Sequence, residues 1–218
     1  MSTFPNTPRT LKGGIVLLDP ETSALQRIIA LQYNPDTLSR TLQAQGTGEN
    51  GDRSEALRLK APPVETLKLE AEIDATDQLE FPDSNPNAVQ AGIYPQLAAL
   101  ETIIYPTSSQ LLANNSLAQG GTLEIIPMQA PLTLFIWSKN RVIPVRITEF
   151  SVTEEAFDIN LNPIRAKVSL GMRVLNVNDL GFTSKGGSLY MIYQQQKERL
   201  AALATGGTFG ALGIGGIP

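Results

Sequence analysis

The 218-residue sequence contains neither cysteine nor histidine, and these two absences exclude most enzyme active-site chemistry. Without cysteine there is no disulfide framework and no thiol nucleophile. Without histidine, the commonest general base and the commonest transition-metal ligand are missing, so Ser-His-Asp and Cys-His catalysis and the usual zinc sites are excluded. Only carboxylate chemistry stays open. Composition alone therefore favours a structural or binding protein, and we expect no enzyme activity, no cofactor and no metal site.

Charge and long hydrophobic runs are also scarce. Charged residues make up 17% of the chain and the formal net charge is -4, whereas a nucleic-acid-binding domain is usually basic. No apolar run approaches the length of a membrane span. The N-terminal sequence MSTFPNTPRTLKGG lacks the apolar core of a signal peptide. We expect no nucleic-acid partner, no membrane insertion and a cytoplasmic location.

The sequence does contain strict alternation of apolar and polar residues, which is typical of strands with one buried face. The clearest example runs from Ile164 to Val174. Its even positions are apolar, and its odd positions include Arg165, Lys167 and Arg173. This pattern predicts a strand with one dry face and one wet, cationic face.

Three further segments belong with this strand. Asn162-Pro163 is turn chemistry, so the alternating segment 157–161 is expected to form a hairpin with it. Segments 132–137 and 142–153 are two more predicted strands. Within 142–153 the apolar residues change parity near Thr148, which predicts a β-bulge. Together the four segments predict an antiparallel meander on which the rest of the chain packs.

The remaining sequence adds further strands and one mid-chain helix. Segment 67–73 alternates cleanly, and a short strand before it, 56–60, is expected to end at Pro62-Pro63. Apolar residues three or four apart, from Val89 to Ile104, predict an amphipathic helix with a kink or late start at Pro95. The other candidate strands are 13–19, 25–33, 38–45 and 122–126. We expect a mainly β fold of two packed antiparallel sheets, barrel-like, with the helix covering one open end.

Two loops could be taken for ligand sites. The loop 46–54 contains the pattern G-x-G-x-x-G, but no buried strand precedes it and Pro62-Pro63 stops the short segment after it, so a flexible loop is favoured over nucleotide binding. Carboxylates recur at every third residue from Asp74 to Asp83. Calcium loops need a denser, convergent ligand set, so a solvated acidic turn is the better interpretation.

Composition divides the chain into three parts. Residues 1–12 form an N-terminal arm. Residues 13–180 form the β domain, which includes a polar loop at 106–121. Residues 181–218 form a C-terminal helix and a glycine-rich tail.

The C-terminal part has apolar residues that need a partner. A helical stripe over 189–203 is apolar on one side only and must bury against something. The tail is either disordered or an extended arm that inserts into a groove on another subunit; its apolar residues are Phe209, Leu212, Ile214 and Ile217. We expect everything from Leu189 onward to dock on a neighbouring subunit and to add little to the fold of its own.

An ordered series of motifs runs through the chain. YNPDTL follows an early strand, TLKLEAEIDATD precedes a helix that ends in ALETIIYP, and PLTLFIWSKNRVIPVRITEFSVTEEAFDINLNPIRAKVSLGMRVL closes the series. Over roughly residues 12–176 this series resembles the tube-protein family of contractile injection systems, the phage-tail-like particles of bacteria. Those relatives have glycine after the tryptophan, where this chain has Ser138 after Trp137. They also have glycine in the segment before the proline, and this chain departs from that pattern before Pro163.

The resemblance implies a baseplate adaptor related to tail-tube subunits. Such a protein would form a ring, expected to be a hexamer, between the central spike and the inner tube, and would initiate tube assembly. Its expected partners are the spike, inner-tube or tube-initiator subunits, and baseplate or sheath proteins. It would assemble in the bacterial cytoplasm and become part of the particle. Many relatives carry a C-terminal LysM module that binds peptidoglycan, but this chain ends differently, so wall binding is not carried over.

Together, the cationic strand face and the resemblance predict that Arg165, Lys167 and Arg173 lie on a subunit interface or on the wall of a lumen. A plain solvated strand face is the alternative. Two other functions stay open. One is a main inner-tube subunit, although such relatives are generally shorter. The other is a wall- or carbohydrate-binding accessory module that uses Trp137 and tyrosine residues as stacking surfaces.

Overall fold

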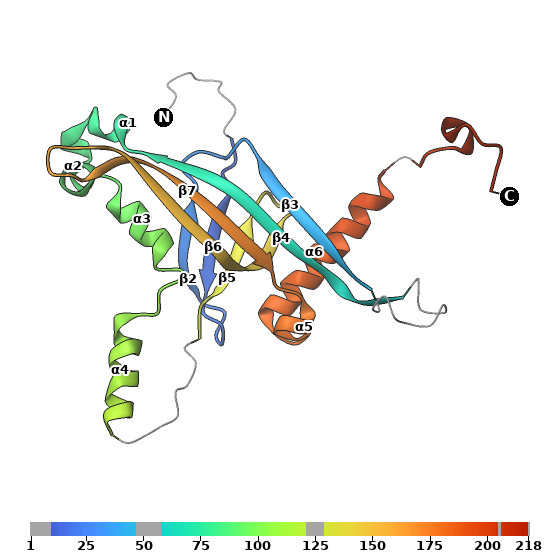
Figure 1. Cartoon of the computed structure of the whole chain (residues 1–218), viewed down its shortest axis with the longest axis horizontal. Coiled ribbons are helices and arrows are strands. Elements are labelled where there is room, and N and C mark those ends of the chain that lie inside the picture. Colours follow the sequence, from blue (N-terminus) through green and yellow to red (C-terminus); the bar gives the residue numbers. More distant parts are fainter. Residues whose placement is uncertain (1–9, 47–57, 121–128, 205, 218) are drawn as a thin grey trace.

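The computed structural model describes residues 10–46, 58–120, 129–204 and 206–217, and its strands form one antiparallel sheet (Figure 1). Across the sheet the seven strands follow the order β2 (Leu25–Ala30), β1 (Gly14–Leu18), β5 (Leu132–Ile136), β6 (Val142–Phe157), β7 (Pro163–Val174), β4 (Leu59–Asp74) and β3 (Leu38–Gly46). The mainly β prediction is confirmed. The finer expectation of two packed sheets or a barrel is wrong, because the described strands form a single sheet that does not close.

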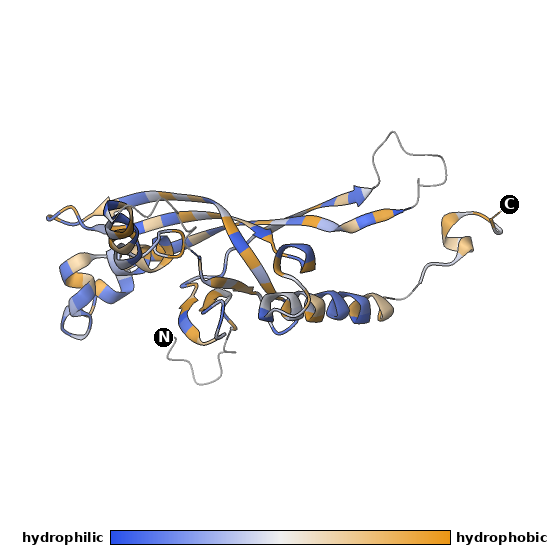
Figure 2. Ribbon diagram, turned by 90° about the horizontal axis from the view of Figure 1, so that it is seen from below, coloured by the Kyte–Doolittle hydropathy of each residue, from blue (hydrophilic) through white to orange (hydrophobic). Residues whose placement is uncertain are grey.

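The length of the strands explains how a single sheet can hold the hydrophobic core. β4 and β6 each run for 16 residues, so right-handed twist accumulates along them and the sheet bends around its own core. Figure 2 shows hydrophilic and hydrophobic residues alternating along these long strands. The core lies on one face of the sheet and includes Leu67, Val168 and Met172 from β4 and β7.

The predicted meander contains three strands instead of four. β6 runs unbroken to Phe157, and the predicted third strand is the turn that joins β6 to β7. Asp158 makes this turn, since its carboxylate accepts hydrogen bonds from the backbone N–H groups of Asn160 and Asn162 at 2.7 and 2.8 Å. The predicted bulge is confirmed, because the β6–β7 register shifts between Ile147 and Glu149.

The proline pair does not end a strand as predicted, because β4 runs through Pro62-Pro63. A proline removes one backbone donor from a ladder, so its cost depends on whether that donor has a partner. The β4–β7 ladder begins only at Thr66, and the β3–β4 ladder is irregular between Gln43 and Gln45, opposite the prolines. The missing donors therefore fall where regular pairing has ended.

The mid-chain helix is divided in two, into α2 (Pro86–Ala91) and α3 (Tyr94–Glu101), after α1 (Thr76–Leu79) and the short 3-10 turn η2 (Pro82–Ser84). The break falls at Gly92, which has φ +54, and Pro95 lies in the first turn of α3. A Cβ on Gly92 would overlap the carbonyl oxygen of Pro163, which also accepts a hydrogen bond from the N–H of Ile93 at 2.9 Å. As predicted, Ile93, Leu97 and Leu100 are core residues, whereas Val89 and Ile104 are exposed.

The expected polar loop 106–121 is wrong in most of its length, because Ser108–Gln119 forms the helix α4. Thr107 caps it in a capping box with Gln110, a T-x-x-Q signal that is visible in the sequence. Figure 1 shows α4 projecting from the body of the molecule. The predicted strand 122–126 and most of the loop 46–54 lie outside the described residues.

The C-terminal helix departs most from expectation. After the short helix α5 (Val177–Leu180), α6 (Lys185–Ala202) packs on the sheet of its own chain. Tyr190 and Tyr193 are core residues, with 6% and 2% exposure, so the expectation that this segment adds little to the fold is wrong. The tail beyond α6, with the 3-10 helix η3 (Phe209–Leu212), extends away from the sheet (Figure 1).

Candidate assembly surfaces

The first candidate surface is the polar face of β4, β7 and β6. Pairing brings the solvent-side residues of the three strands into rows across the sheet, such as Asp74–Arg165–Glu155 and Glu72–Lys167–Thr153. The helices α3 and α6 contribute their buried residues to the core on the opposite face. The polar face is thus the side of these strands on which side chains meet solvent.

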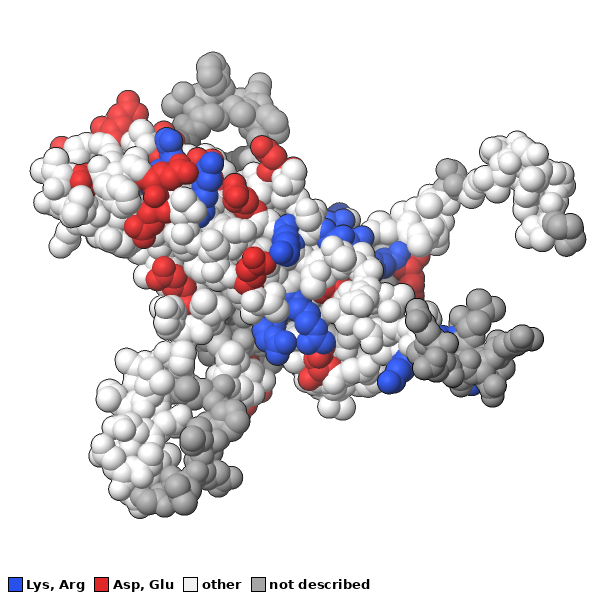
Figure 3. Space-filling view, viewed as in Figure 1, with Lys and Arg blue, Asp and Glu red and all other residues white. Residues whose placement is uncertain are grey.

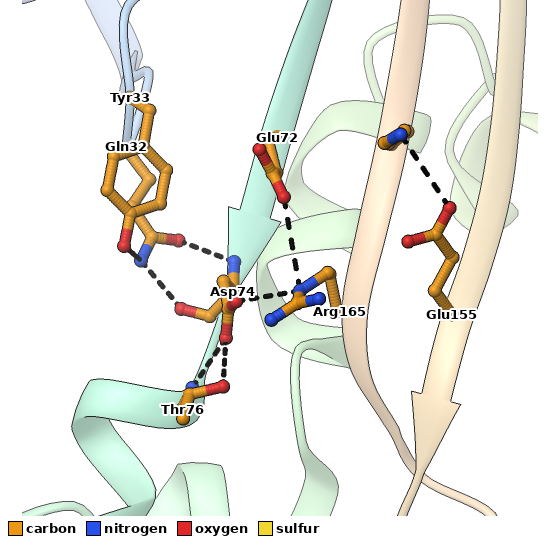
Figure 4. A network of polar contacts seen from close by, with 8 residues as sticks. Gln32, Tyr33, Glu72, Asp74, Thr76, Glu155 and Arg165 are labelled. Carbon is orange, nitrogen blue, oxygen red and sulfur yellow. Dashed lines mark hydrogen bonds and ion pairs between the residues drawn. The ribbon is translucent and has the colours of Figure 1, made fainter.

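This face is not simply cationic, because each predicted cation has a carboxylate partner in its own chain. The Arg165 Nε lies 2.8 Å from an Asp74 carboxylate oxygen and 3.9 Å from Glu72 (Figure 4). The Lys167 Nζ lies 3.9 Å from Glu155. Sequence reasoning on β7 alone could not show these pairs, because the carboxylates come from neighbouring strands.

The third predicted cation lies further along the face. An Arg173 Nη donates to the Asp179 carboxylate of α5 at 2.8 Å. Between Lys167 and Arg173 along this face, the Lys68 Nζ is 2.9 Å from a carboxylate oxygen of Glu149. Gly171 separates the strands that carry this pair, and a Cβ there would lie 2.8 Å from the Glu149 Cβ. The glycine therefore leaves room for Glu149 to cross β7 and reach Lys68.

Asp74 is held in its charged form at the end of β4. Partial burial raises the pKa of its carboxyl, but hydrogen bonds from the Thr76 hydroxyl and backbone N–H and from Arg165 outweigh burial, so the net shift is downward. The same contact with Asp74 raises the pKa of Arg165. The amide of Gln32 forms a pair of bonds with the Asp74 backbone, at 3.0 and 2.6 Å, and so ties the segment after β2 to the end of β4 (Figure 4).

Glu65 forms a buried polar cluster that sequence reasoning missed. Its side chain is 3% exposed, accepts a hydrogen bond from the Tyr193 hydroxyl at 2.9 Å and lies 2.8 Å from the Lys197 Nζ. The Arg40 Nε is 3.6 Å away. A signal was present in the sequence, because Glu65 lies two residues before Leu67 and therefore on the core-facing side of β4. This cluster joins β3, β4 and α6, so it fixes α6 to the sheet.

The second candidate surface consists of two projections with exposed apolar side chains. No residue of α4 is buried, and Leu111, Leu112 and Leu117 are exposed. In the tail, the predicted arm residues Phe209, Leu212, Ile214 and Ile217 are exposed as well. Exposed apolar groups of this kind are typical of segments that bury on a partner.

Other candidate sites from the sequence have no support in the geometry. Trp137 stacks on the core residue Phe135, with ring centroids 5.9 Å apart, and packs against the core. It is therefore not the open stacking surface that a carbohydrate-binding module would need. Among the described residues, no acidic group has a geometry that could hold a metal ion. In the same part of the chain, no helix is long and apolar enough to cross a membrane.

The fold and its surfaces define a class of protein: a β-sheet protein with an exposed polar face on its long strands and with projecting apolar segments. No protein-family model matches the sequence, and no curated protein matches it. Among solved structures, a chain of the tail of an empty GTA particle with C6 symmetry aligns with 75% of this chain and 90% of its own, at 11% identity and a TM-score of 0.28. A chain of the virion of the native gene transfer agent (GTA) particle aligns with 74% and 90%, at 12% identity and a TM-score of 0.26. Similarities this low carry no argument about fold or function.

Proposed function

We propose that this chain is a structural subunit of a phage-tail-like injection particle. The observation that carries the proposal is the pair of projections, α4 and the tail after α6, whose leucines, Phe209 and isoleucines are exposed. Burying an apolar side chain of this size contributes about 1.5–3 kcal/mol, so a partner surface that covers several of them gains substantial binding energy. The kind of assembly, a phage-tail-like particle, is inferred from the ordered motif series in the sequence.

Within that particle, we propose a ring-forming adaptor between the central spike and the inner tube, which initiates tube assembly. The polar face with Arg165, Lys167 and Arg173 would lie at a subunit contact or on the lumen wall. Phe209, Leu212 and Ile214 would contact a neighbouring subunit. The internal ion pairs change the chemistry of this part of the polar face, since Arg165, Lys167 and Arg173 each already have a carboxylate partner and a neighbouring subunit would not meet them as free cations.

Deletion of the gene in the bacterium that encodes the chain tests this function. We expect spike and sheath proteins to be made but to remain separate in a gradient, because no ring connects spike to tube. Expression of the intact chain from a plasmid should restore particles. Expression of a chain truncated after Ala204 should restore them poorly, because it keeps the described core and lacks only the tail. Normal particles in the deletion strain would contradict the proposal.

A further inference from the structure

The charges on the three long strands and the elements joined to them are separated by sign. Along β7 the sign changes between Ser169, which pairs with Glu70, and Gly171, which pairs with Lys68. On the side of Ser169 there are nine carboxylates and two cations: Glu70, Glu72, Asp74, Asp77, Glu80, Asp83, Glu154, Glu155, Asp158, Arg165 and Lys167. Figure 3 shows this acidic end around α1 and the β6–β7 turn. Both of its cations are already paired within it.

The other side is basic. From the level of Gly171 onward, cations outnumber carboxylates: Arg40, Arg58, Lys60, Lys68, Lys139, Arg141, Arg146, Arg173, Lys185, Lys197 and Arg199 against Glu65, Glu149, Asp179 and Glu198. α6 belongs to this end because Lys197 reaches Glu65 and Gln196 reaches Asn140. Figure 3 shows lysines and arginines gathered over the middle of the sheet and towards α6.

Each end also exposes large apolar side chains among its charges. At the acidic end these are Phe81, Phe157, Ile159 and Leu161, and Ile159 is 99% exposed. At the basic end they are Leu42, Leu59, Leu200 and Leu203. Protein–protein interfaces usually combine apolar side chains with polar and charged ones. Here the charges at the two ends have opposite signs.

We propose that the acidic end of one copy docks on the basic end of a second copy. Like ends repel and unlike ends attract, so the charges fix a head-to-tail orientation, and the apolar residues at the two ends supply most of the binding energy. Because the two contacting surfaces differ, the contact repeats from copy to copy, either closing into a ring or continuing as a stack. This deepens the proposed assembly function by naming the surfaces that meet.

Carboxylates available for the contact lie on the outer surface of the acidic end. Among the described residues, Glu70, Asp77, Glu80, Asp83 and Glu154 are exposed and form no ion pair. At the basic end, Lys60, Lys139, Arg146, Lys185 and Arg199 are likewise exposed and outside every ion pair of the described chain. A second copy therefore offers each set the partners that its own chain does not provide.

A charge swap on the full-length purified chain tests the proposal. One variant carries Glu80→Lys, Asp83→Lys and Glu154→Lys, which leaves six carboxylates and five cations at the acidic end and so removes nearly all of its excess of negative charge. The other carries Lys60→Glu, Lys139→Glu and Arg199→Glu, which leaves eight cations and seven carboxylates at the basic end and so removes nearly all of its excess of positive charge. Each variant alone should be monomeric in sedimentation velocity, and an equimolar mixture should associate. Wild-type association should weaken about tenfold or more between 50 and 300 mM salt.

A polar substitution tests the apolar part. Ile159→Ser should weaken association of the wild-type chain without changing its salt dependence, whereas Ile28→Ser on β2, which is also exposed and belongs to neither end, should not. Unchanged thermal melting would show that the variants are folded. A wild-type chain that stays monomeric at low salt, a single variant that associates like wild type, or a folded mixture that does not associate would each overturn the proposal. Particles that still contain the chain would then leave the proposed function standing.

Discussion

Tyr193 gives the sharpest test of how the C-terminal helix is held. Its hydroxyl donates to the buried Glu65 carboxylate, and the Lys197 ammonium lies both near that carboxylate and 4.0 Å from the centroid of the Tyr193 ring. Tyr193→Phe removes one hydrogen bond to a charged acceptor and keeps the ring. Such a bond contributes about 1.5–3 kcal/mol, so we expect a loss of about 2 kcal/mol in the free energy of unfolding.

Replacing Glu65 should cost more. Glu65→Ala leaves a buried hydroxyl without its acceptor and removes packing volume, for which about 3–5 kcal/mol is typical. Lys197 is 30% exposed, so Lys197→Met should cost only about 0.5–1 kcal/mol after screening by water. A loss of stability that is largest for the Glu65 variant, smaller for the Tyr193 variant and smallest for the Lys197 variant would therefore indicate a cluster centred on the Glu65 carboxylate.

Urea denaturation of the full chain followed by circular dichroism measures these losses. Tyr105→Phe is the matched control, because Tyr105 is 66% exposed and should change stability by less than about 0.5 kcal/mol. A double-mutant cycle of Tyr193→Phe and Glu65→Gln should give a coupling energy of about 1–2 kcal/mol. A Tyr193→Phe variant as stable as wild type, or a chain truncated after Asp179 that melts normally, would refute a core role for α6.

The same residue predicts a pH effect. Burial, followed by the charge and hydrogen bond of Glu65, raises the pKa of Tyr193 above the ordinary value of 10.0. The unfolded chain then loses this proton first as pH rises, so the contribution to stability is complete below pH 10 and falls above it. In Tyr193→Phe, the loss of stability above pH 10 should be smaller.

Three further predictions concern single positions. Gly187→Ala should destabilise the chain by more than about 2 kcal/mol in urea melts, because a Cβ would overlap the Gly181 carbonyl oxygen, whereas Gly206→Ala has open space and should be neutral. Ser138→Gly should raise stability by about 0.5–1 kcal/mol, because φ at Ser138 is 73; a decrease would contradict the backbone argument. Asp74→Asn should reduce the loss of stability on acidification below about pH 4, because hydrogen bonds from Thr76 and then Arg165 lower the pKa of Asp74 and make its charged form stabilising above the unfolded value of 3.8. An unchanged loss of stability in acid would argue against these contacts.

The strand pattern was predictable because period-two alternation reports burial directly. It located β7 and half of β4, and the parity change located the bulge at Thr148. It failed where the deciding contact lies elsewhere in the chain. Pro62-Pro63 is tolerated within β4 because of where two ladders end, and Gly92 breaks the helix because Pro163 lies against it.

The candidate surfaces were less predictable for the same reason. Arg165 and Lys167 looked like free cations in the β7 sequence, but β4 and β6 supply their partners. α6 looked like a detached arm because its one-sided apolar stripe lies beyond the predicted β domain, and only Glu65, at a core-facing position far away in sequence, shows where Tyr193 binds. The exposure of the tail residues agrees with the sequence pattern, and their docking stays a prediction.

Electron cryo-microscopy of purified particles, with a tag at the N-terminus of this chain, tests the central claim most directly. The account predicts density for one ring of this chain where the central spike meets the inner tube, with α4 and the tail each covered by a neighbouring subunit. The chain repeated along the whole tube would indicate the main tube subunit instead. Particles that lack the chain would contradict the account.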